Sequence, residues 1–354
     1  MKSTIRIKDI ARMAGVSEGT VDRVLHKRGD VSARSLEAVN KVLKEINYTP
    51  NILARSLASK KVFRFVYLIP KNEHGDYWAA VEAGFEKAMP EFEGYNVTYD
   101  RIYFDQFDVK SFVEAINRVL NDLPQGVIMA PIFSAETLEF TAQLSQLNIP
   151  FSFIDSLVDD NRFLSYYGQN SVLSGYIAAK FLTEDLKEGD SILVIRTRRK
   201  GSVSNQTKSR FIGFKNYLAE NKLSEKFKLI EVEFVDDNEE INISHLKTLF
   251  EGQNNIKAAI TFNSKVFRLA MKLEKLGITD IKLIGYDLLA ENINYLKKGI
   301  IDLLIAQHPE KQSYLSVKDM CRKLVFGQEI KQINYMPIDI LIKENIDSYI
   351  QFVD

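Results

Sequence analysis

Polar, charged and aromatic side chains follow a series of short apolar runs in the larger, C-terminal part of the sequence. The candidates for ligand contact are Tyr77, Trp78, Asp155, Asn170, Arg196, Arg198, Arg210, Asn263, Asp287 and Gln307. Carboxylate, amide and guanidinium groups can each form hydrogen bonds with two neighbouring hydroxyl groups, and an aromatic face packs against C–H groups. This combination suits a polyhydroxylated small molecule, and a sugar is the first expectation.

The basic cluster RTRRK at residues 196–200 leaves the charge of that ligand open. It is either a solvated loop or a clamp for an acidic or phosphorylated sugar, because a neutral sugar needs no such cluster. Arg196 and Arg198 have the same parity on the expected strand SILVIRT, so both should project to one side, and Arg210 follows on the next expected helix. Trp78, the only tryptophan, also has two interpretations, a core residue or an aromatic platform for the ligand.

The sequence contains none of the common catalytic or metal-binding motifs. G-x-x-x-x-G-K, H-E-x-x-H and G-x-G-x-x-G are missing, and Cys321 is the only cysteine. The letters GVSEG at residues 15–19 join two expected helices, so they form no G-x-S-x-G elbow, which needs a strand before the serine. The histidines, which show no metal-ligand spacing, are His26, His74, His245 and His308. We therefore expect a protein that is not an enzyme, with no cofactor, no metal and no disulfide. The charged start of the chain and the lack of a long apolar run indicate a cytoplasmic protein without a membrane segment.

The formal net charge of zero conceals an asymmetry along the chain. Residues 1–61 contain 13 Lys and Arg against 6 Asp and Glu, a net charge of +7, and the remaining residues contain 34 against 41, a net charge of −7. A small basic segment therefore precedes a large acidic body, and the basic segment suits a polyanion. Its strong hydrophobic patterning argues against a merely solvated tail.

The basic segment has the pattern of three short helices. Apolar residues from Ile7 to Ala14 follow helical spacing, GVS interrupts it, and Ser17 is placed to cap a second helix with Val21, Val24 and Leu25 on its buried side. A third helix fits residues 32–46, with Ser32 as its cap. The residues expected in its apolar stripe are Leu36, Val39, Val42, Leu43 and Ile46. Two short helices joined at a tight glycine turn predict a helix-turn-helix, whose second helix enters the DNA major groove.

The segments IKDIARMAGVSEGTVDRVL, VSARSLEAVNKVLKEINYTPN and ARSLA resemble the DNA-binding headpiece of the lactose and galactose repressor family, in order and at the usual spacing. The resemblance covers about the first sixty residues. It implies phosphate contacts and one base contact, from Arg23, most plausibly to guanine. The residues implied in phosphate contacts are Ser17, Thr20, Ser35 and Asn51. It also implies that residues 50–58 form a hinge helix, whose Leu57 wedges into the minor groove.

The second helix departs from the family at positions that often select the operator's bases, where this sequence has Glu18 and Gly19. Glu18 either accepts a hydrogen bond from a cytosine amino group or stabilises the helix N-terminus electrostatically. Gly19 contacts no base and lowers helix propensity, so we expect it to allow the backbone to approach DNA closely. For Asp22 we favour a role in orienting Arg23.

The rest of the sequence alternates between strand-like and helix-like segments. The expected strands are RFVYLIP, NVTYDRIYF, GVIMAPI and PFSFIDS, followed by SILVIRT, FKLIEVEFV, KAAITFN and KLIGYD. Expected helices lie near 77–89, 108–121, 135–147, 171–185, 205–221 and 264–276. Two such series predict two doubly wound α/β lobes with parallel sheets, whose ligands bind at the carboxyl ends of the strands. This part resembles the type I periplasmic sugar-binding proteins, the fold that also forms the effector domain of the repressor family.

Together these observations predict an α plus α/β architecture: a three-helix headpiece with a hinge helix, then a two-lobed periplasmic-binding-protein-like effector domain. We expect the headpiece at 1–48, the hinge helix and linker at 49–61 and the ligand-binding domain at 62–354. The first lobe takes about 62–167 and 308–337, and the second about 168–307 and 338–354. The chain should cross between the lobes near 166–170, 305–309 and 335–338.

The function predicted from these features is that of a transcriptional regulator, a repressor, that binds operator DNA under control of a sugar or acidic sugar derivative. No heptad pattern follows residues 333–346, so we expect a homodimer and not a tetramer. The alternatives are a solute (sugar) binding receptor and a doubly wound α/β enzyme with a basic tail. A solute receptor needs an export signal that the sequence does not show, and an enzyme needs a nucleophile or cofactor loop and leaves the headpiece motifs unexplained.

Overall fold

The structure is a computed structural model, and it describes residues 6–25, 28–29, 31–46, 61–197, 204–234, 238–252 and 254–353. The chain divides into two compact units, Met1–Ser59 and Lys60–Asp354. We call them the DNA-binding unit and the effector unit, after the functions that the sequence predicts for them. No helix among the described residues is long and apolar enough to cross a membrane.

The DNA-binding unit contains the three helices that the sequence predicted: α1 Ile7–Ala14, α2 Glu18–Leu25 and α3 Ala33–Glu45. Their buried residues are Ile10, Ala11, Val21, Val24, Val39 and Val42. Gly15 ends α1 in the left-handed region, with φ 64°, where glycine is favoured because it has no Cβ. The Ser32 side chain caps α3 by accepting from the Ser35 N–H. Leu36, expected in the apolar stripe of α3, is instead 42% exposed, so that expectation was wrong.

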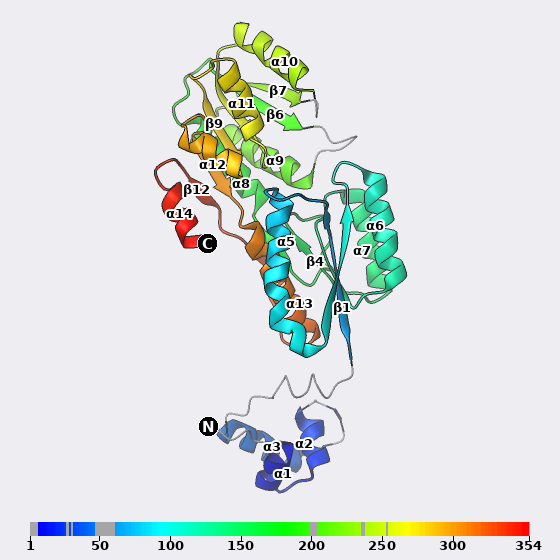
Figure 1. Cartoon of the computed structure of the whole chain (residues 1–354). Helices are drawn as coiled ribbons and strands as arrows, with labels where there is room; N and C mark the ends of the chain where they lie inside the picture. The colour runs from blue at the N-terminus through cyan, green and yellow to red at the C-terminus, as the bar shows by residue number, and fades with distance from the viewer. Residues whose placement is uncertain are drawn as a thin grey trace. The chain divides into compact units, whose positions relative to one another are not determined.

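The effector unit consists of two α/β lobes, each built on a six-stranded sheet (Figure 1). The first sheet has the order β11-β5-β4-β3-β1-β2 and all its strands are parallel. Its strands are β1 Phe63–Pro70, β2 Val97–Phe104, β3 Gly126–Met129, β4 Phe151–Ile154, β5 Tyr166–Gly168 and β11 Ile333–Tyr335. The helices of this lobe are α5 Tyr77–Ala88, the 3-10 helix η1 Met89–Tyr95, α6 Val109–Asp122, α7 Ser134–Gln146 and α13 Pro309–Leu324.

The second sheet has the order β12-β10-β9-β8-β6-β7, parallel except for the antiparallel pair β10 and β12. Its strands are β6 Ser191–Thr197, β7 Lys228–Phe234, β8 Ile256–Thr261, β9 Lys282–Tyr286, β10 Leu303–Ala306 and β12 Asp339–Leu341. Its helices are α8 Ser171–Thr183, α9 Asn205–Glu220, α10 Glu239–Glu251, α11 Phe267–Lys275, α12 Ala290–Lys297 and α14 Ile346–Val353. The two sheets with helices around them confirm the predicted fold class.

Alternation along the strands explains why the second sheet is covered on both faces. On β6, Ile192 and Val194 belong to the cluster formed with α8 and α9. Leu193 and Ile195 belong to the other cluster, formed with α10, α11, α12 and α14. Successive side chains of a strand point to opposite faces, so a continuous apolar run can bury both sides of a sheet.

The chain passes between the two sheets three times. The first crossing, residues 168–170, leads from β5 to α8; the second, 306–308, leads from β10 to α13; the third, 336–338, leads from β11 to β12. A backbone hydrogen bond joins two of them, from the Met336 N–H to the Gly168 carbonyl (2.9 Å). These crossings connect the lobes beside the carboxyl ends of the strands, where the candidate pocket lies.

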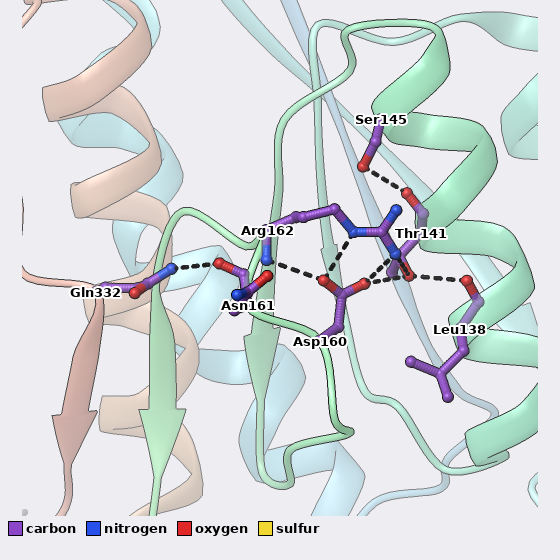
Figure 2. A network of polar contacts seen from close by, with 7 residues as sticks. All are labelled: Leu138, Thr141, Ser145, Asp160, Asn161, Arg162 and Gln332. Carbon is purple, nitrogen blue, oxygen red and sulfur yellow. Dashed lines mark hydrogen bonds and ion pairs between the residues drawn. The ribbon is translucent and has the colours of Figure 1, made fainter.

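A network of polar contacts holds the segment between β4 and β5 (Figure 2). The Arg162 guanidinium donates to both oxygens of the buried Asp160 carboxylate, at 2.9 and 2.7 Å, and Thr141 donates to the same carboxylate. The hydrogen bonds from Arg162 lower the pKa of Asp160 to about 2. The Gln332 amide donates to the carbonyls of Asn161 (2.9 Å) and Phe163 (2.8 Å), which ties this segment to the residue before β11. The network thereby fixes the segment that begins at Asp155.

Candidate functional site

A pocket lies between the two lobes, at the carboxyl ends of their strands. It has a volume of about 50 Å³. The first lobe lines it with Tyr77, Trp78, Gln106, Ile132, Asp155 and Ser156. The second lobe and the second crossing contribute Ser204, Gln206, Thr207, Asn263, Ser264, Asp287 and Gln307. This is the place at which open parallel sheets bind their ligands.

Two aspartates hold equivalent places in the two lobes. Asp155 directly follows β4 and Asp287 directly follows β9. Both are buried, and both have backbone angles in the left-handed region, with φ of 69° and 71°. A non-glycine residue in this conformation is uncommon and is often found where a functional side chain must be aimed. Each of the two lobes thus presents one carboxylate to the same pocket.

On the first-lobe side, Tyr77 and Asp155 form a direct hydrogen bond. The Tyr77 hydroxyl donates to Asp155 Oδ1 at 2.7 Å. Burial raises the pKa of Tyr77 well above its ordinary value, and the charges of Asp155 and Asp287 raise it further, so the hydroxyl keeps its proton. The Trp78 ring lies edge-on to the Tyr77 ring, with centroids 5.1 Å apart. Trp78 is only 7% exposed and lines the pocket, so its burial fits a core residue, and its role as an aromatic platform stays a prediction.

Gln206 and Gln307 connect this pair to the second lobe. The Gln206 amide donates to Asp155 Oδ1 (2.9 Å) and to Gln307 Oε1 (2.7 Å). The Gln307 amide donates to both carboxylate oxygens of Asp287, at 2.7 and 2.9 Å. The result is a continuous chain of hydrogen-bonding groups from Tyr77 across both lobes to Asp287.

Further contacts hold the lobes together at the start of α9. The Asn205 side chain donates to the Pro131 carbonyl at 3.2 Å and accepts from the Ser134 hydroxyl. Asn205 and Gln206 are the first two residues of α9 in the second lobe, whereas Pro131 and Ser134 belong to the first. The first turn of α9 is therefore the main direct link between the lobes at the pocket.

Arg210 lies one turn further along α9 and is completely buried. Its Nη1 donates to the Phe262 carbonyl (2.7 Å), and its guanidinium stacks 3.8 Å above the Tyr286 ring. Its Nε and Nη2 have no hydrogen-bond partner among the described residues. Leaving buried charged donors unpaired is costly, so a water or ligand atom that reached these two groups would stabilise the folded protein. Gly175 permits this placement, because a Cβ there would lie 1.8 Å from the Arg210 carbonyl oxygen.

Asp287 has an unusual protonation equilibrium. Burial raises its pKa to about 7, although the Arg210 charge and the hydrogen bonds from Gln307 oppose the shift. The carboxyl therefore titrates near neutral pH, which makes the pocket's charge sensitive to pH in that range.

The structure brings together most of the residues that the sequence suggested for ligand contact. Tyr77, Trp78, Asp155, Asn263, Asp287 and Gln307 line the pocket. Arg210 is not among the lining residues, but its positive charge lowers the pKa of Asp287. Sequence reasoning missed Gln106, Ile132, Ser156, Ser204, Gln206, Thr207 and Ser264. One signal in the sequence could have found some of them. Ser204 caps the helix that follows the strand SILVIRT, and the first turn after such a cap faces the crevice.

Two candidate residues lie elsewhere. The Arg196 guanidinium stacks 4.4 Å above the Phe211 ring and forms an ion pair with Glu231 on β7, so the expectation that it faces the ligand does not fit the structure. Asn170 caps α8 by accepting from the Leu173 N–H at 3.0 Å and does not line the pocket. Arg198 lies outside the described residues.

On the DNA-binding unit, the residues suggested for DNA contact lie at the surface. Ser17, Glu18, Gly19 and Arg23 are exposed on or next to α2, and Thr20 and Ser35 are half-buried. The Ser17 hydroxyl accepts from the Thr20 N–H (3.2 Å), as an N-cap does. Asn51 and Leu57 lie outside the described residues.

Two side chains of α2 bear on the alternatives raised by the sequence. Glu18 lies in the first turn of α2, a position compatible with both of its interpretations. The Asp22 carboxylate forms an ion pair with Arg28 at 3.4 Å, and its role in orienting Arg23 stays a prediction. A Cβ at Gly19 would meet only the Ser17 hydroxyl, at 3.9 Å, so nothing in the described unit requires glycine there.

Two protein-family models match this sequence. One is described as a periplasmic binding protein domain and matches residues 65–329. The other is described as bacterial regulatory proteins of the lacI family and matches residues 6–51. The chain belongs to the lacI family of bacterial regulatory proteins. This lacI-family regulator therefore combines a helix-turn-helix DNA-binding unit with an effector unit of the periplasmic-binding-protein type.

Individual relatives agree with this assignment. The ribose operon repressor of Halalkalibacterium halodurans is 26% identical over 308 residues, 84% of this chain and 86% of that protein. A solved structure described as a "putative LacI transcriptional regulator" from Bacteroides fragilis is 37% identical, with a TM-score of 0.75, and the match covers 82% of this chain and 100% of that one. GanP, a glucose-galactose binding protein from Geobacillus stearothermophilus, shares the fold at 22% identity, with a TM-score of 0.68 and coverage of 81% and 99%. The regulator thus resembles transcription factors along nearly its whole length.

Proposed function

We propose that the regulator binds operator DNA as a homodimer in the cytoplasm, and that a neutral sugar bound between its lobes controls this binding without chemical conversion. The hydrogen-bonded chain from Tyr77 through Asp155, Gln206 and Gln307 to Asp287 supports the proposal best. Each of these groups can exchange its present partner for a sugar hydroxyl. The Trp78 ring at the same pocket offers an apolar surface to the C–H face of a sugar ring.

The charge of the pocket favours a neutral effector over an acidic or phosphorylated one. Asp155 and Asp287 contribute two carboxylates, and Arg210 is the guanidinium next to them. Arg196, which would have strengthened the case for an anion, is already paired with Glu231. An anionic effector would add like charge beside the Asp155 carboxylate and, as the pH rises above 7, beside that of Asp287 as well, an arrangement that buried sites disfavour.

The proposed DNA contacts follow the family resemblance. Ser17, Thr20, Ser35 and Asn51 contact phosphates, and Arg23 contacts a base edge in the major groove. Glu18 joins Arg23 on the exposed side of α2 and selects among base pairs. The hinge segment 50–58 places Leu57 in the minor groove of a bent operator. Most of the affinity comes from phosphate contacts of the segment 1–61 with its net charge of +7.

A thermal-shift and calorimetry screen tests the proposed effector class. D-ribose is the first probe because a relative is named a ribose operon repressor. It is compared with other neutral pentoses and hexoses, with D-ribonate and with D-ribose 5-phosphate. We expect a neutral sugar to raise the melting temperature of the full chain, because a ligand held between the lobes stabilises the folded state by mass action.

The control variants separate the pocket from the rest of the unit. Asp155→Asn should weaken binding of the selected sugar by roughly tenfold or more, because the carboxylate accepts hydrogen bonds that an amide accepts less strongly. Asp280→Asn changes an exposed aspartate that pairs with Lys257, and it should bind sugar like the wild type. Tight binding of D-ribose 5-phosphate or D-ribonate, with no neutral sugar bound comparably, would overturn the neutral-effector proposal.

A further inference from the structure

Gln169 connects the three crossings between the lobes. It is 1% exposed and belongs to the first crossing. Its amide nitrogen donates to the Ala306 carbonyl in the second crossing (2.5 Å) and to the Pro337 carbonyl in the third (2.8 Å). One side chain therefore uses both of its N–H groups to hold the other two crossings in place.

The surroundings of Gln169 fix its own position. The Tyr166 hydroxyl donates to the backbone carbonyl of Gln169 (2.9 Å), and the backbone carbonyl oxygen of Asp155 lies 3.3 Å from the same hydroxyl. The preceding residue has to be glycine, because a Cβ at Gly168 would lie 2.2 Å from the Tyr166 hydroxyl and 2.8 Å from the Asp155 carbonyl oxygen. Gln169 is therefore placed by the same backbone that carries the pocket residue Asp155.

A second contact joins the later two crossings from another direction. His308 Nε2 lies 2.6 Å from Asp339 Oδ2, and the Tyr349 hydroxyl of α14 donates to the same carboxylate oxygen (2.8 Å). His308 directly follows Gln307, the pocket residue that binds Asp287. The second crossing is thus held at the Ala306 carbonyl by Gln169 and at the His308 side chain by Asp339.

The hydrogen bonding of Gln169 argues against a purely stabilising role. Its side-chain carbonyl oxygen is buried and has no hydrogen-bond partner among the described residues. A buried polar atom without a partner destabilises the folded state. What the residue supplies is a pair of donors that reach two separate segments, and this arrangement determines how those segments can move.

We propose that Gln169 is a positioning residue that makes the three crossings move as a single hinge. It acts on the pocket through the backbone of Ala306 and Gln307 and touches no effector itself. Its effect on regulation rests on the proposed function, in which closure of the lobes around a sugar controls DNA binding. The hinge itself can be tested without any sugar.

Disulfide formation across the lobes measures their closure. Ser134 and Asn205 are in hydrogen-bond contact across the pocket, so cysteines at both positions in the full-length chain should oxidise to a disulfide when the lobes meet. Gln169→Met retains the length of the side chain and removes its donors. Because Gln169 makes its two bonds in the arrangement in which the lobes touch, we expect Gln169→Met to slow this disulfide formation by about tenfold.

Gln125→Leu is the matched control, because Gln125 accepts from the Arg64 N–H (2.8 Å) inside the first lobe, away from the crossings. This variant should leave the rate of disulfide formation unchanged. An equal rate with and without the Gln169 change, in a protein of unaltered secondary structure, would overturn the proposal. A slowed rate of equal size in the Gln125 variant would overturn it as well, since a merely structural loss would then explain both.

Hydrogen exchange of the wild-type chain provides a test that needs no variant to fold. Peptides that cover 164–172, 303–309 and 333–340 should open with one common free energy if the three crossings form one unit. Three distinct opening free energies would contradict the proposal. Neither measurement contains a sugar, so a failure of the neutral-effector proposal, seen as no sugar binding in calorimetry, stays distinguishable from a failure of the hinge.

Discussion

Stability of the effector unit should fall as the pH rises through neutrality, because of Asp287. Burial raises the pKa of Asp287 to about 7 in the folded protein, against an ordinary value of 3.8. Between these two values the folded state holds a proton that the unfolded chain has lost, so the free energy of unfolding decreases with increasing pH. For a single group with these two pKa values, the loss between pH 6 and pH 8 is about 1.4 kcal/mol.

Urea denaturation followed by tryptophan fluorescence measures this loss directly. Trp78 is the only tryptophan and is buried in the effector unit, so its fluorescence reports on that unit and not on the DNA-binding unit. The measurement is made at pH 6, 7 and 8 on the wild type and on Asp287→Asn, which cannot titrate. The difference in unfolding free energy between the two proteins should change by about 1.4 kcal/mol over this range, in favour of the variant at high pH.

Asp280→Asn is the control for other titrating groups. The pKa of Asp280 is lowered by its hydrogen bond with Lys257, so this carboxylate is ionised throughout the range and its variant should follow the wild-type pH profile. A difference between wild type and Asp287→Asn that stays constant from pH 6 to pH 8 would refute the reasoning. Such a result would mean that the hydrogen bonds from Gln307 and the charge of Arg210 fully offset the increase in the pKa of Asp287 that burial causes.

Three other substitutions test the two units. Gly19→Ala should stabilise the DNA-binding unit by about 1 kcal/mol in calorimetry, because its Cβ meets only the Ser17 hydroxyl at 3.9 Å. The same change should weaken operator binding in fluorescence anisotropy, and an unchanged DNA affinity would contradict a close approach of the backbone to DNA at this position. Arg196→Met should lower the stability of the effector unit by about 1 kcal/mol, because it removes the ion pair with Glu231 and the stacking on Phe211. Its sugar affinity should be unchanged in calorimetry, and a selective loss of sugar affinity would show that Arg196 contacts the ligand. Arg23→Ala should reduce the free energy of operator binding by about 1 to 3 kcal/mol at one base position, whereas Ser35→Ala should weaken binding to all DNA sequences alike. Binding-site selection with each variant distinguishes the two effects, and an unchanged base preference without Arg23 counts against its assignment as a base contact.

The fold was predictable because local patterns agreed with the final arrangement. Each run such as FVYLI in β1 is buried on both sides, and helices of the right length separate the runs. The helices α10, α12, α13 and α14 were not among those expected from the sequence. The first turn of α10 contains Glu239 and Glu240 directly after an acidic run, and its buried residues are few. A helix whose apolar contribution is small has a weak periodic signal, and tertiary packing decides its formation.

Whether a site residue could be predicted from the sequence depends on how far along the chain its orienting contacts lie. Asp155 and Asp287 were accessible from sequence because they end strands of parallel sheets, and the end of a strand has a known direction. Arg196 also lies near the end of a strand, but its side chain is directed by Glu231 on β7, 35 positions later in the sequence. Local spacing carries no information about such a partner. Gln206 was missed for a related reason, since its position in the pocket depends on where α9 begins relative to the first lobe.

The position of the two aspartates restricts which ligands can regulate this protein. A ligand shifts a conformational equilibrium only by the difference between its affinities for the two states. A molecule that bonds to Asp155 alone meets the same first lobe whether or not the second lobe has closed, so it binds without shifting the equilibrium. A molecule that bonds to both Asp155 and Asp287 finds its full set of partners only when Gln206 and Gln307 bring the lobes together. Under the proposed function, regulation therefore requires an effector with hydroxyl groups at both ends, and a sugar lacking the hydroxyl that faces Asp287 should occupy the pocket while leaving DNA affinity unchanged.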